Sequence, residues 1–160
     1  MKGIQGFTIA AASLWIAASL QKGLVPHLAF GGVAPDFLLI VVATLGLFSD
    51  VRSGAMLGFF AGLMQGSLCG ANLAIYIVSR TICGYLLGWF NSLELVSNPL
   101  VAVIAAAAVT VGSQLFVMFW APPSGISAFL ASTAGSAIIN GLIGAPVYIL
   151  MRQILGTRRL

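Results

Sequence analysis

The chain has 160 residues, of which 60% are apolar and only 6% charged, with a formal net charge of +4. An ordinary soluble domain carries about 25% charged residues, so this composition excludes a water-soluble globular protein. The basic residues are too dispersed for a nucleic-acid-binding face, and the length suits one helical domain over residues 1–160. The sequence therefore predicts an all-α, polytopic membrane bundle, with membrane lipids as its surroundings.

Apolar runs separated by Gly, Pro or charge predict six membrane-spanning helices. In chain order they cover residues 4–21, 36–50, 54–70, 72–90, 99–120 and 126–151. The second and third spans have only about 15 to 17 residues, or roughly 22 to 26 Å of helix, so they must stand upright or thin the bilayer.

Loop cations predict that both termini are cytoplasmic. In this orientation Lys22 is the outer cation, and the inner ones are Lys2, Arg52, Arg152, Arg158 and Arg159. A five-span alternative would put Lys2 and the Arg158/Arg159 pair on opposite sides. Small residues near the end of the first span resemble a signal-peptide cleavage site, but the long apolar stretch favours a retained helix.

The connection between the first two spans predicts an outer segment that lies in the membrane interface. It contains His27, the one histidine of the chain, to which we assign no chemistry. It ends in Pro35 and Asp36, which suit the first turn of a helix because proline needs no N–H donor there and a carboxylate favours the positive end of the helix dipole. The alternative role for Asp36 is to receive a cation or a partner's donor group.

The third span contains the strongest pattern, a glycine ladder with glycine at every fourth position. Its members are Gly54, Gly58, Gly62, Gly66 and Gly70, and the fourth span continues the spacing with Gly84 and Gly88. In water such glycines would each cost about 0.5–1 kcal/mol relative to alanine, but in lipid they let helix backbones approach closely. The ladder predicts a packing surface, either inside this bundle or as a groove for a partner's helix.

Arg80 lies near the middle of the fourth span, where an arginine costs at least about 2.5–3.5 kcal/mol. It must therefore face the bundle, water or a partner. Asp36 is the acid that the span register places in the same half of the membrane, and Gln114 and Asn140 complete a candidate polar site with Arg80. We predict that Arg80 hydrogen-bonds within the bundle or to a lipid or partner group.

Catalytic chemistry is not predicted. The sequence lacks a second histidine, paired carboxylates and a phosphate-binding loop, and Asp36 and Asp50 lie at opposite ends of one span. Cys69 and Cys83 lie in apolar sequence without a metal-ligand spacing, so we expect packing roles for them and neither a metal nor a cofactor.

Four segments together resemble the MreD family of bacterial rod-shape proteins, over nearly the whole chain. They are GGVAPDFLLIVVATLGLF, GAMLGFFAGLMQG, GANLAIYIVSRTICGYLLG and INGLIGAPVYILMRQILGTRR. The chain departs from the family pattern after the ladder, where an aspartate is common and this chain has Gln65 and Gly66. Arg80 stands where some relatives have lysine.

The resemblance implies a scaffold of the cell-wall elongation complex, or elongasome, in the bacterial inner membrane. MreD-like proteins associate with MreC and, through it, with MreB, the RodA glycosyltransferase and a class B penicillin-binding transpeptidase of peptidoglycan synthesis. Their fold looks like that of the S components of energy-coupling-factor transporters.

Two alternatives remain at this point. An S-component-like subunit would bind a small molecule near Arg80, Gln114 and Asn140. A proton-coupled transporter would need a mid-membrane acid or histidine, which this sequence lacks.

Overall fold

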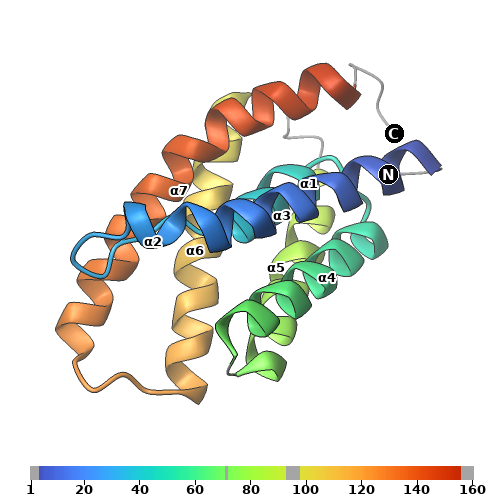
Figure 1. The fold of residues 1–160 in the computed structure, drawn as a ribbon. Coiled ribbons are helices and arrows are strands. Elements are labelled where there is room, and N and C mark those ends of the chain that lie inside the picture. The colour runs from blue at the N-terminus through green and yellow to red at the C-terminus, as the bar shows by residue number, and fades with distance from the viewer. Residues whose placement is uncertain (1–3, 71, 93–97, 156–160) are drawn as a thin grey trace.

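A computed structural model of the chain describes residues 4–70, 72–92 and 98–155, which form seven helices (Figure 1). They are α1 (Ile4–Gly23), α2 (Val25–Leu28), α3 (Phe37–Gly46), α4 (Val51–Cys69), α5 (Leu73–Asn91), α6 (Pro99–Trp120) and α7 (Ile126–Leu155). By length and composition, three of these helices, α5, α6 and α7, can each cross a membrane. The predicted all-α class is therefore confirmed.

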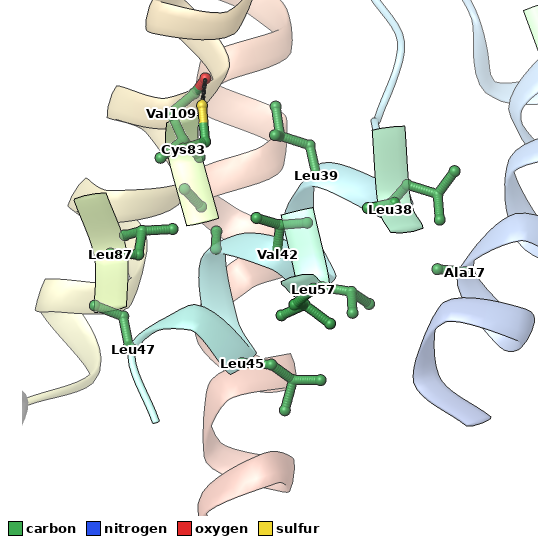
Figure 2. Packing of buried hydrophobic residues seen from close by; sticks show 14 of the residues in the cluster. Ala17, Leu38, Leu39, Val42, Leu45, Leu47, Leu57, Cys83, Leu87 and Val109 are labelled. Carbon is green, nitrogen blue, oxygen red and sulfur yellow. Dashed lines mark hydrogen bonds between the residues drawn. The ribbon is translucent and has the colours of Figure 1, made fainter. Parts of the chain in front are cut away.

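The helix α3 forms the centre of the fold and packs against α1, α4, α5, α6 and α7 (Figure 1). Nine of its ten residues are buried, and its sequence FLLIVVATLG is apolar on every side, as a helix surrounded by protein requires. Figure 2 shows the side chains of α3 among those of its neighbours, with Ala17 from α1, Leu57 from α4, and Cys83 and Leu87 from α5.

Two helical hairpins surround this centre. The helices α4 and α5 form one, joined near Gly70, and α6 and α7 form the other, joined through residues 121–125 (Figure 1). In both hairpins glycine or alanine lies where the helices meet, so the backbones can come close together.

The second predicted span is longer than the helix observed. It ends at Gly46 rather than at residue 50 because the chain turns there, with the Phe48 and Ser49 N–H groups donating to Leu45 and Gly46. The third span begins at Val51 rather than at 54, and the last continues to Leu155 rather than to 151. Its Pro146 is exposed within α7 and does not end the helix.

Candidate functional site: a buried polar cluster at the start of α3

The cluster is built around Asp36, which precedes α3. Asp36 Oδ1 accepts a hydrogen bond from Leu39 N at 2.9 Å, which caps the helix. Pro35 before it is buried, so the segment that enters α3 is held inside the protein. A carboxylate here also lies at the positive end of the α3 dipole.

Arg80 from α5 forms an ion pair with Asp36 through its Nη2 atom. Its Nη1 donates to Ser113 Oγ of α6 at 3.3 Å, and its guanidinium carbon lies 5.2 Å from the centre of the Tyr76 ring. Arg80 is 1% exposed, so its charge is enclosed by protein. The Asp36 side chain is 19% exposed, so the pair is open on the carboxylate side.

The helix α7 supplies the other side of the cluster through Asn140 and Ser136. Asn140 Oδ1 accepts from Asp36 N at 2.9 Å, and its Nδ2 donates to Thr110 Oγ1 of α6 at 2.9 Å. Ser136 Oγ accepts from Ala34 N at 3.2 Å. Asn140 is fully buried and thereby joins α3, α6 and α7.

The helix α1 reaches the same point through Gln21, whose Oε1 accepts from Phe37 N at 2.8 Å. Side chains of α1, α5 and α7 therefore bond directly to residues 34–37. Side chains of α6 bond to Arg80 and Asn140, which are among these partners. In a low-dielectric interior such bonds are strong, and leaving any of these groups without a partner is costly.

Gln114 is not part of this cluster, although the sequence analysis grouped it with Arg80 and Asn140. It is half-buried, and its side chain makes no hydrogen bond to any residue that the structure describes. Its neighbour Ser113 is the residue of α6 that faces Arg80.

Asn140→Leu should lower the free energy of unfolding by about 1–3 kcal/mol, because it leaves the Asp36 N–H without a partner and removes the bond from Asn140 Nδ2 to Thr110 Oγ1. The matched control, Gln114→Leu, breaks no hydrogen bond within the described residues and should change stability by less than about 0.5 kcal/mol. Unfolding of the purified protein by SDS in mixed micelles measures both. Equal losses in the two variants would contradict this assignment.

Four members of the cluster were not predicted from the sequence: Gln21, Thr110, Ser113 and Ser136. A signal was present in α6 and α7, where polar residues recur at helical spacing. They are Thr110 and Ser113 on α6, and Thr133, Ser136 and Asn140 on α7. Polar residues three or four positions apart on an otherwise apolar helix share one face, and in a membrane that face turns to the protein interior.

The glycine ladder lies against α5. A Cβ atom at Gly54 or Gly58 would overlap the carbonyl oxygen of Gly84 or Arg80, and one at Gly62 would lie 2.5 Å from Tyr76 O. In the other direction, Gly84 meets Gly54, and Gly88 meets the Asp50 backbone. A partner helix could use this face only if α4 and α5 separated.

The last two residues of the ladder, Gly66 and Gly70, lie at the end of α4, where the α4–α5 hairpin turns. Gly66 contacts the Leu73 side chain at the hairpin end, and Gly70 follows α4 with a φ of +67° and nothing within 4 Å of a Cβ. Gly70 is the C-cap, where a left-handed conformation favours glycine, and it is not a packing residue. Spacing alone does not separate a cap from a ladder position, because glycine serves both.

The α6–α7 hairpin has its own close contacts, at two glycines of α7 that were not predicted as packing positions. A Cβ at Gly144 would lie 3.0 Å from Ala106 Cβ, and one at Gly141 would lie 3.1 Å from Val103 O.

Within the described ranges, no group of three or more His, Cys, Asp or Glu residues could hold a metal ion. Cys83 is buried, with Sγ 3.9 Å from Val109 O (Figure 2), whereas Cys69 is exposed and His27 is exposed in α2.

Comparison with known proteins agrees with the membrane fold. The model of one family, described as rod shape-determining protein MreD, matches residues 1–156. Neither the comparison with curated proteins nor that with solved structures gave a match. The chain is a membrane protein with helices able to span the bilayer, and it belongs to the MreD family of rod shape-determining proteins.

Proposed function

We propose that this protein is a non-enzymatic scaffold of the cell-wall elongation complex. It binds the membrane-spanning part of MreC and, through MreC, associates with MreB, RodA and a class B penicillin-binding transpeptidase during peptidoglycan synthesis. The observation that carries this proposal is that the buried polar residues are engaged in holding the bundle together. Asp36 bonds to Arg80 and Asn140, and Asn140 also bonds to α6. Family membership supplies the link to rod shape.

The proposal includes the membrane topology. Six helices, all but α2, form a single bundle of the S-component type in the inner membrane, with both termini cytoplasmic. The short α3 is compatible with this arrangement because protein surrounds it, and non-helical backbone at membrane depth is tolerated where protein covers it. The beginning of α1 and the end of α7 lie toward the same end of the molecule (Figure 1), which supports a shared side for the termini.

The partner's helix is proposed to bind an outward-facing apolar surface rather than the glycine ladder. The ladder is occupied by α5, whereas large apolar side chains such as Phe59 on α4, Ile104 on α6 and Leu142 on α7 are exposed. Side chains of this kind make van der Waals contact with either lipid or another helix.

Site-specific photo-crosslinking in cells tests the scaffold role and finds the face used. Crosslinkers at Phe59, Ile104 and Leu142 sample three helices, and crosslinkers that replace the large, fully buried side chains of Leu38 and Tyr148 serve as buried controls. We expect MreC adducts at one or more of the three exposed positions and none at the buried ones. Adducts only at the buried positions, or none at all despite co-purification with MreC, would contradict the proposal.

A small-molecule-binding role of the S-component type is the second candidate. It is favoured by two buried atoms near the cluster, Arg80 Nε and Thr133 Oγ1, which have no hydrogen-bond partner within the described part of the chain. Native mass spectrometry of the purified protein distinguishes the candidates. A bound small molecule that is retained by wild type and lost in Thr133→Val would favour this role, and its absence would favour the scaffold.

A further inference from the structure

An apolar groove runs along the outside of the bundle between α1 and α4. Its volume is about 350 Å³, and it is lined from α1 by Phe7, Ala10, Ala11, Leu14 and Trp15, and from α4 by Ser53, Met56, Leu57, Phe60 and Met64. No described residue of another helix lines it. In a membrane this groove meets the hydrocarbon region, where any occupant must be apolar.

One end of the groove is polar and charged. Ser53 lines it in the first turn of α4, and the adjacent Arg52 is exposed, with no side-chain hydrogen bond or ion pair to the described residues. Because residues four apart share a face of a helix, Arg52 is continuous with Met56 and Phe60 along the groove. The amide groups of the first turn of α4 point to the same end.

The chemistry of the groove suits a lipid, because its walls are mainly apolar and a cation lies at its polar end. An extended acyl chain, about 4–5 Å across at van der Waals contact, can lie along the apolar side chains of α1 and α4. Met56 and Met64 are flexible enough to adapt to it.

We propose that the α1–α4 groove binds one anionic phospholipid, with an acyl chain between the two helices and the phosphate at Arg52. This site is distinct from the polar cluster at α3 and goes beyond the scaffold function. Anionic lipids attract basic residues at the membrane surface with about 1 kcal/mol for each Lys or Arg, which corresponds to roughly a fivefold change in affinity.

Asp50 carries the opposite charge two positions before Arg52, so its substitution should have the opposite effect on the binding of an anion. It precedes α4, and hydrogen bonding from Ser53 lowers the pKa of its carboxyl group, so it is ionised at neutral pH beside the proposed phosphate position. Removing its charge should strengthen the binding of an anion, whereas removing the charge of Arg52 should weaken it.

Quenching of Trp15 by brominated lipids tests the proposal in the full-length protein. In a Trp89→Phe/Trp120→Phe background, Trp15 in the groove is the reporter. We expect dibromo-phosphatidylglycerol to quench it with about fivefold higher affinity than dibromo-phosphatidylcholine. Arg52→Gln should abolish this preference, and Asp50→Asn should increase it.

Arg152→Gln is the matched control. It removes the same charge near the same end of the bundle, one turn from Tyr148, whose ring stacks on Phe48 in the turn before α4. It should keep the preference. Circular dichroism and elution from size exclusion should match wild type in every variant.

Several outcomes would overturn the proposal. They are equal quenching by the two lipids in wild type, equal loss of preference in Arg152→Gln and Arg52→Gln, or a preference that falls in Asp50→Asn. Absence of quenching by either lipid, together with an α1–α4 crosslink to MreC or to a second copy of this chain, would show that a protein helix covers the groove instead.

Discussion

Replacing Asp36 with asparagine should lower the free energy of unfolding by about 3–5 kcal/mol, because it leaves the buried Arg80 guanidinium without its counter-charge. Asparagine keeps a side-chain oxygen to accept from Leu39 N, so the loss reports on the ion pair rather than on the helix cap. SDS-induced unfolding in mixed micelles measures it.

Arg80→Leu should cost less than Asp36→Asn. It removes the charged group that is fully buried and leaves Asp36, which is partly exposed and still bonded to Leu39 N and to Asn140 through its backbone. The double variant should be more stable than Asp36→Asn alone, because an unpaired buried charge is worse than no charge. An Asp36→Asn variant as stable as wild type, or a double variant less stable than both single ones, would contradict this account.

Gly58→Leu should disrupt the α4–α5 hairpin, with a loss of about 3 kcal/mol or more. A Cβ at this position already overlaps the Arg80 carbonyl, and a displaced Arg80 backbone would also disturb the polar cluster. Gly58→Ala should therefore be destabilising as well, although alanine is the better helix former.

The control for Gly58 is the same change at Gly112, on α6. A Cβ at Gly112 would meet nothing within 4 Å, so Gly112→Leu should leave stability within about 0.5 kcal/mol of wild type or raise it. If Gly58→Leu instead kept full stability and lost only MreC co-purification, the ladder would serve a partner rather than α5.

Much of the fold could be predicted from the sequence because lipid imposes a simple rule. Apolar stretches must be helical there to satisfy their own backbone, so the breaks between them mark the helix ends. Five of the predicted spans begin or end within a few residues of α1, α4, α5, α6 and α7. The prediction was least accurate for α3, because this helix has 10 residues, about half the length of a membrane span.

The composition could not indicate that α3 is central. A helix that is apolar on every side suits burial in protein and exposure to lipid equally well, so its hydrophobicity carries no information about its neighbours. Only the packing of five other helices around it shows which of the two environments it has.

Part of the candidate site could also be predicted from the sequence, for a related reason. A mid-membrane arginine requires a partner, and charged residues are so rare in this chain that Asp36 stood out. The neutral partners were harder to identify, because Ser, Thr and Gln can bond to their own helix backbone and need no tertiary partner. Thr44 and Ser49, both buried, do this in the structure, whereas Ser136 and Gln21 accept from another segment.

The sequence by itself determined that this protein is a helical membrane bundle, that Arg80 needs a partner and that its glycines allow close helix contact. The tertiary structure decided which helix lies against the glycines and which polar groups meet at Asp36. The physical reason is that helix formation in lipid is a local requirement of each segment, whereas helix pairing depends on the fit of small-residue faces and buried polar groups between segments far apart in the chain.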